Sequence, residues 1–90
     1  MSLNKLLVKD IIEKVKSEDF KFGGYGYHNY GYHLNGFHND GISFRIWTLE
    51  TADNSTRMEL DFDHKEIMYN SKDDNASEIA NILSLNGWKI

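Results

Sequence analysis

The sequence predicts one α+β domain over residues 1–90, with an antiparallel sheet of four to five strands and an N-terminal and a C-terminal helix packed on one face. Three observations predict this fold. Apolar residues recur with helical spacing at the start of the chain, alternate with polar residues in its middle, and recur with helical spacing near its end. Ninety residues fit a single hydrophobic core. Each helix has one apolar face, and we expect both of these faces to pack on the same side of the sheet.

The opening segment "LNKLLVKDIIEKVK" is typical of an amphipathic helix over about residues 3–17. Leu3, Leu7, Ile11 and Val15 recur every four residues and therefore share one face. The opposite side is charged: Lys5, Lys9, Asp10, Glu13, Lys14 and Lys16.

Residues 23–41 hold six of the seven glycines, arranged as repeated Gly-aromatic-His units. The segments "HNYG", "LNGF" and "HNDG" carry Asn-Gly-type turn chemistry, which predicts a hairpin here and a turn before Ile42. Three interpretations stay open: aromatic packing beside the glycines, a recognition surface, or a metal site. The recognition surface would use Tyr27, Tyr30 and Tyr32, and the metal site would use His28, His33 and His38, with Asp40 as a further ligand.

Residues 42–70 are predicted to form a three-stranded antiparallel meander. In "ISFRIWTLE" the alternation places Ile42, Phe44 and Ile46 on one face, which we expect to be the buried one. The other face then carries Ser43, Arg45, Trp47 and Leu49. In "RMELDF" we expect Met58, Leu60 and Phe62 to point inward. Glu59 and Asp61 then share the outer face of that strand.

The segment "DDNASEIANILSLNGW" predicts the second helix. Asn75 and Glu78 have the spacing of a capping box, and Ser71 with Asp74 is the alternative. The helix is expected to end at Asn86-Gly87, with Gly87 in the left-handed conformation and Trp88 folding back towards Leu83. The residues expected on its buried face are Ala76, Ile79, Ala80 and Leu83.

Charge and composition restrict the classes of function. The net charge is −4, and residues 46–90 hold nine Asp or Glu against four Lys or Arg. This balance argues against a protein that reads the phosphate backbone of a nucleic acid. The chain has no cysteine, no nucleophile motif and no apolar run of membrane-spanning length. We therefore expect a cytoplasmic, non-enzymatic protein that binds no cofactor and does not associate with membranes.

Three segments are similar to one known family: "DIIEKVKSEDFKF" (residues 10–22), "NDG" (39–41) and "SEIANILSLNGW" (77–88). They resemble the small phage-encoded anti-CRISPR proteins that inhibit RNA-guided type II effector nucleases. The resemblance implies inhibition by an acidic surface that mimics the DNA motif the nuclease reads, in the host cytoplasm. Asp40 is the residue that carries over as a contact. Ser43 stands near the place of the next acidic contact of that family, and no acidic residue follows Trp88.

The leading functional hypothesis is thus a protein-binding inhibitor whose partner has a basic, nucleic-acid-binding groove, such as a type II CRISPR nuclease. Direct nucleic-acid binding is not expected. The predicted contacts are Asp40, Glu59, Asp61, Asp63, Asp73 and Asp74, with Tyr27, Tyr30 and Tyr32 as aromatic contacts. The alternatives are single-stranded nucleic-acid or nucleotide binding through the Tyr/His/Gly hairpin, and a small metal-binding module based on His28, His33 and His38.

Overall fold

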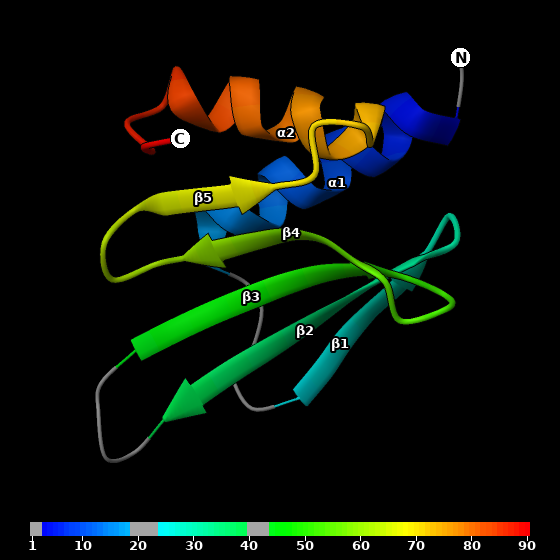
Figure 1. The fold of residues 1–90 in the computed structure, drawn as a ribbon, viewed down its shortest axis with the longest axis horizontal. Coiled ribbons are helices and arrows are strands. Elements are labelled where there is room, and N and C mark those ends of the chain that lie inside the picture. Colours follow the sequence, from blue (N-terminus) through cyan, green and yellow to red (C-terminus); the bar gives the residue numbers. More distant parts are fainter. Residues whose placement is uncertain (1–2, 19–23, 40–43) are drawn as a thin grey trace.

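The computed structural model describes residues 3–18, 24–39 and 44–90, and it forms two layers. One layer holds the two helices and the other a single sheet of five strands (Figure 1). In chain order the elements are α1 (Leu3–Ser17), β1 (Gly24–Asn29), β2 (Tyr32–Asn39), β3 (Phe44–Thr51), β4 (Thr56–Asp61), β5 (Glu66–Tyr69) and α2 (Asp74–Ser84). The predicted α+β class, the first helix over residues 3–17 and the meander are confirmed.

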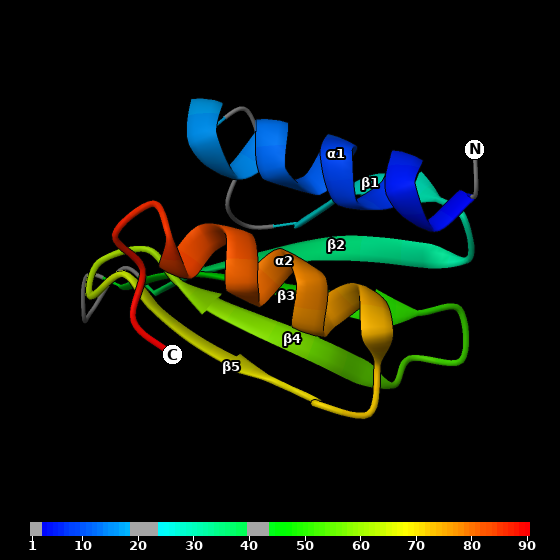
Figure 2. The same ribbon diagram turned by 90° about the horizontal axis from the view of Figure 1, so that it is seen from above.

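The sheet is a plain antiparallel meander in which each strand pairs with the next one in the chain. The order β1-β2-β3-β4-β5 leaves β1 and β5 at its two edges. The two helices lie side by side on one face and run in the same direction (Figures 1 and 2). Among the described residues, no helix lies on the opposite face of the sheet.

The first hairpin turns at Tyr30-Gly31, within the predicted segment "HNYG". Both residues have positive φ, 56° and 79°, which is the conformation of a type I′ turn. The predicted turn at "LNGF" is wrong, because these residues lie inside β2 and pair with β3. The predicted turn at "HNDG" continues into residues 40–43, which lie outside the described part of the chain.

The predicted inward face of β3 is wrong. Trp47 and Leu49 are fully buried, whereas Ile46 is only half-buried. Ile42 and the Phe44 side chain lie outside the described residues. The correction has a physical reason: both faces of this strand are rich in apolar residues, so alternation alone offers two solutions. The register decides between them, because Leu49 pairs with Leu34 and Met58, and Trp47 pairs with Leu60.

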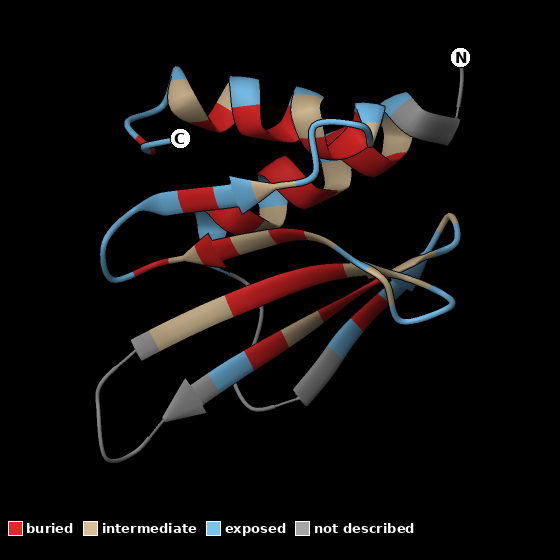
Figure 3. Ribbon diagram, viewed as in Figure 1, coloured by how far each residue is buried: buried red, intermediate tan, exposed pale blue. Residues whose placement is uncertain are grey.

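The core lies between the sheet and the two helices (Figure 3). Trp47 packs on Phe62 with ring centroids 4.4 Å apart, and Phe62 meets Trp88 edge to face at 5.1 Å. These three aromatic residues join β3, the turn after β4 and the segment after α2. The inward residues predicted for β4 and α2 are confirmed: Met58, Leu60, Phe62, Ala76, Ile79, Ala80 and Leu83.

The two ends of α2 differ in how well the sequence predicted them. The N-cap is Asp73, whose carboxylate accepts a hydrogen bond from the Ala76 N–H, so both predicted capping pairs are wrong. The C-terminal prediction is confirmed, because Gly87 has φ of 95°. The Trp88 N–H donates to the Leu83 carbonyl at 3.1 Å, which folds the chain back over the helix end. Lys89 then pairs with the edge of β5 beside Glu66.

Candidate functional site

We call the side of the sheet that faces away from α1 and α2 the open face. The strand register aligns its side chains in rows across the sheet. One row runs through Phe37, Ile46, Asp61 and Glu66, and the next runs through Asn35, Thr48, Glu59 and Met68. A third row holds His28, His33 and Glu50.

Apart from the two histidines, the ionisable side chains in these rows are acidic. Glu50, Glu59, Asp61 and Glu66 contribute four carboxylates, and none of the row positions is Lys or Arg. Asp61 and Glu66 stand directly opposite each other on neighbouring strands. Like charges in this arrangement destabilise a sheet.

Two large apolar side chains are also exposed on this face. Phe37 is 46% exposed and Met68 is 70% exposed. Met68 is the cross-strand neighbour of Glu59, and Phe37 is the cross-strand neighbour of Ile46. Met and aromatic residues are enriched in protein interfaces, so these two side chains are candidate contacts for a partner.

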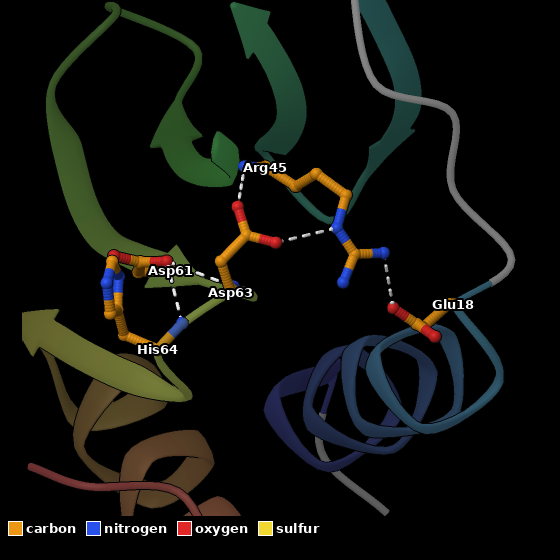
Figure 4. Close-up of polar contacts among 5 residues, drawn as sticks. All are labelled: Glu18, Arg45, Asp61, Asp63 and His64. Atoms are coloured by element: carbon orange, nitrogen blue, oxygen red, sulfur yellow. Dashed lines mark hydrogen bonds and ion pairs between the residues drawn. The ribbon is translucent and has the colours of Figure 1, made fainter. Parts of the chain in front are cut away.

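Three of the predicted acidic contacts have partners inside the molecule: Asp61, Asp63 and Asp73, of which Figure 4 shows the first two. Asp61 accepts hydrogen bonds from the N–H groups of Asp63 and His64, and its other oxygen lies 2.8 Å from His64 Nδ1. Asp63 accepts from the backbone N–H of Arg45 at 2.8 Å and from its Nε at 3.1 Å. Arg45 also donates to Glu18 at 2.9 Å, so this network ties the end of α1 to β3 and to the β4–β5 turn.

The contact with His64 moves the pKa of both groups. Partial burial alone would raise the pKa of Asp61, but the hydrogen bonds from the His64 ring and from the two backbone N–H groups outweigh it and lower the value. The hydrogen bond that the His64 ring donates to the Asp61 carboxylate raises the pKa of the imidazole. His64 itself is exposed.

This pair predicts a pH dependence with two limbs. The contribution of Asp61 is present above its unfolded pKa of about 4 and is lost as the pH falls. The contribution of His64 is present below its unfolded pKa of about 6.5 and is lost as the pH rises through its raised folded value. The pair should therefore stabilise the fold most between the two unfolded pKa values, from about pH 4 to about pH 6.5.

An NMR titration of the His64 ring should show its pKa falling in Asp61→Asn. Asp53→Asn is the matched control, because Asp53 lies in the β3–β4 turn and bonds Thr51 and Ser55 instead. An unchanged His64 titration in Asp61→Asn would show that the two side chains do not interact in solution.

Asp73 is the most strongly engaged of the predicted acidic contacts. Besides capping α2, it accepts a hydrogen bond from the Tyr32 hydroxyl at 3.0 Å and lies 3.8 Å from Arg57 Nε. The Asn75 amide donates to the same Tyr32 oxygen at 3.1 Å. Burial is the main reason why the pKa of Tyr32 is raised. Asp73 thus holds the start of α2 against β2.

Glu59 and Asp74 are different, because neither side chain makes a hydrogen bond or ion pair within the described part of the chain. Glu59 lies on the open face, and Asp74 lies in the exposed first turn of α2. Asp40, the contact implied by the family resemblance, lies outside the described residues. The predicted acidic contacts therefore do not form one patch: Glu59 and Asp61 share a face, while Asp73 and Asp74 lie at the helix start.

The three predicted aromatic contacts lie at or near the helix-covered side of the first hairpin. Tyr27 is buried, its hydroxyl lies 3.4 Å from the Asp10 carboxylate, and the Lys14 ammonium lies 5.7 Å from its ring centroid. Burial, followed by the Asp10 charge, raises the pKa of Tyr27. Tyr30 and Tyr32 are half-buried against the core. A base or a partner would have to displace these contacts to stack on the ring of Tyr27.

Two of the three repeat histidines come together on the open face. The rings of His28 and His33 lie 5.5 Å apart, and His33 Nε2 lies 3.6 Å from the Glu50 carboxylate. Among the described residues, no group of three or more His, Asp or Glu is arranged to hold a metal ion. The side chain of His38 and all of Asp40 lie outside that part, so the three-histidine site stays a prediction.

The contacts predicted from the sequence leave out four residues of the open face: Phe37, Glu50, Glu66 and Met68. Alternation within β4 placed Glu59 and Asp61 correctly, and the same rule applied to "EIMY" would have added Glu66 and Met68. Glu50 and Phe37 depended on the face of β3, which alternation alone left ambiguous.

No protein-family model matches this sequence, and no curated protein or solved structure is significantly similar to it. Among the described residues, neither helix is long and apolar enough to cross a membrane.

Proposed function

We propose that the chain is a non-enzymatic protein-binding module whose open face docks onto a basic, nucleic-acid-binding groove of a protein partner. The observation that carries this proposal is the array of Glu59, Asp61 and Glu66 on a sheet face that neither described helix covers and whose rows hold no Lys or Arg. Such an array attracts a basic surface and speeds its association. The contact also offsets the repulsion between Asp61 and Glu66.

The exposed side chains of Phe37 and Met68 support the same proposal. Charges alone give long-range attraction, whereas buried apolar contacts slow dissociation. Met68 is next to Glu59 across the strand pair, so one partner surface could cover both. We expect Glu59, Glu66 and Met68 to be the main contacts, because the Asp61 carboxylate is already hydrogen-bonded to His64.

The resemblance at residues 10–22, 39–41 and 77–88 supports a specific partner: an RNA-guided type II nuclease that a phage protein inhibits in the host cytoplasm. In that case the carboxylates of the open face stand in for DNA phosphates. Asp40 would add a contact in the same manner.

A DNA-cleavage assay with a panel of type II nucleases tests both parts of the proposal. The parent chain should inhibit at least one nuclease, and Glu59→Gln/Glu66→Gln should weaken inhibition by about tenfold or more. The matched control is Glu13→Gln/Glu78→Gln, which removes two exposed carboxylates from the helices. Inhibition by the parent should also fall as the salt concentration rises.

The possible failures are distinguishable. Full inhibition by Glu59→Gln/Glu66→Gln would reject the open face as the contact while keeping the target. Absence of inhibition by the parent across the panel would reject the nuclease as the partner.

A further inference from the structure

A groove runs between α1 and α2 on the solvent side of the helical layer, away from the open face. Its volume is about 390 Å³. Figure 2 shows the two helices that form it lying side by side. The residues that line it are Lys5, Val8, Lys9, Ile12, Glu13 and Lys16 of α1, and Glu78 and Ile82 of α2.

The floor of this groove is apolar and its rim is mainly basic. Val8 and Ile12 are 5% and 8% exposed, and Ile82 is half-buried between the helices. The side chains of Lys5, Lys9 and Lys16 are exposed and make no ion pair within the described part of the chain. Three lysines against Glu13 and Glu78 leave the groove with positive charge.

The placement of two of these lysines has an electrostatic cost. The first turn of α1 contains no acidic residue, although the N-terminus of a helix carries partial positive charge. Lys5 adds a cation near that end, and Lys9 adds another one turn later on the same face. Like charges four residues apart destabilise a helix, and a bound anionic group would remove this repulsion.

We propose that this groove binds an acidic amphipathic helix of a protein partner. Lys5 and Lys16 are eleven residues apart, so the rim extends about 16 Å along α1, or about three turns of a docked helix. Apolar side chains spaced three and four residues apart would fill the floor over Val8, Ile12 and Ile82. Glutamates beside them would reach Lys5, Lys9 and Lys16.

Two other anionic partners fit the groove less well. A nucleic-acid backbone has no apolar side chains for the floor, and Glu13 and Glu78 repel its regularly spaced phosphates. A lipid surface is broad, whereas Val8 and Ile12 lie recessed below the lysines and are reached only by a protruding side chain. The groove and the open face thus have opposite charge and lie in different layers, and binding at the groove does not depend on the function proposed above.

Fluorescence anisotropy with a labelled model peptide tests this inference. The probe is an amphipathic helical peptide with Leu spaced three and four residues apart and Glu at the flanking positions. It should bind the parent chain, and a scrambled peptide of the same composition should bind much more weakly. Lys5→Gln/Lys9→Gln and Ile82→Asn should each raise the Kd by about tenfold.

Matched variants separate the groove from general surface effects. Lys72→Gln/Lys89→Gln removes the same charge elsewhere, and Leu85→Asn removes an apolar side chain that is 87% exposed outside the groove. Both should leave the Kd unchanged. Circular dichroism should show all four variants folded, because the changed side chains are exposed or half-buried.

Three results would overturn the inference. The first is equal binding of the scrambled and helical peptides. The second is equal loss of affinity in the groove variants and their matched controls. The third is no binding of the peptide together with Lys5- and Lys9-dependent binding of phosphatidylserine vesicles, which would assign the groove to a membrane surface instead.

Discussion

Trp47→Ala is expected to lower the free energy of unfolding by about 3–5 kcal/mol. The side chain is fully buried at the centre of the sheet, and its ring packs on Phe62, which in turn contacts Trp88. Removing the indole therefore leaves a large cavity where β3, the β4–β5 turn and the C-terminal segment meet. Because small domains are only marginally stable, this loss is a large part of the total.

Ile46→Ala is the matched control, since Ile46 is the preceding residue in the same strand and points to the open face. It is half-buried, so its truncation should cost only about 1 kcal/mol. Urea denaturation of both variants gives the comparison. If Ile46→Ala cost more than Trp47→Ala, the inward face of β3 would be the one that alternation first indicated.

The elements that the sequence predicted well are those whose pattern has one solution. The N-terminal helix has a single apolar stripe through Leu7, Ile11 and Val15, and its observed bounds agree with the prediction. The strand "RMELDF" is equally clear, because Glu59 and Asp61 exclude the other face from the core. The local spacing of apolar residues was sufficient in both cases.

The failures occur where several local solutions compete. In β3 apolar residues occupy both faces, and only pairing with Leu34 and Leu60 selects Trp47 and Leu49. Before α2, the segment "SKDDNAS" offers several side chains that can cap a helix. Asp73 is selected by contacts with Tyr32 and Arg57, which lie far away in the sequence.

In the candidate site, too, some features follow from the local sequence and others depend on contacts between distant residues. Sequence reasoning could identify acidic residues on one strand face, but it could not decide which carboxylates are already engaged. Asp63, in the β4–β5 turn, binds Arg45 of β3, and Asp61 binds His64 in the same turn. Only the three-dimensional arrangement distinguishes these from Glu59, which remains available to a partner.

Asp73→Ala is expected to lower the free energy of unfolding by about 2–4 kcal/mol. Loss of a helix N-cap costs about 0.5–2 kcal/mol. Loss of the carboxylate that accepts from the hydroxyl of Tyr32, which is half-buried, adds about 1–3 kcal/mol. The Asp73 side chain is only 7% exposed, so water replaces it poorly, and Arg57 Nε loses its neighbouring carboxylate as well.

Asp74→Ala is the control for this prediction. Asp74 is the next residue, is exposed, and contributes mainly its favourable position in the first turn of α2, so the cost should be below about 1 kcal/mol. Thermal and urea unfolding of the two variants measure the difference. Similar stability of both would show that the contacts of Asp73 with Ala76 and Tyr32 contribute little in solution.

The same pair of variants tests whether Asp73 is a partner contact, as the sequence suggested. Binding should be measured at a temperature where both variants are folded. Because the Asp73 carboxylate is already engaged by Ala76, Tyr32 and Arg57, we expect folded Asp73→Ala to bind a basic partner as the parent does. A fall in affinity in folded Asp73→Ala, with none in Glu59→Gln, would move the interface from the open face to the start of α2.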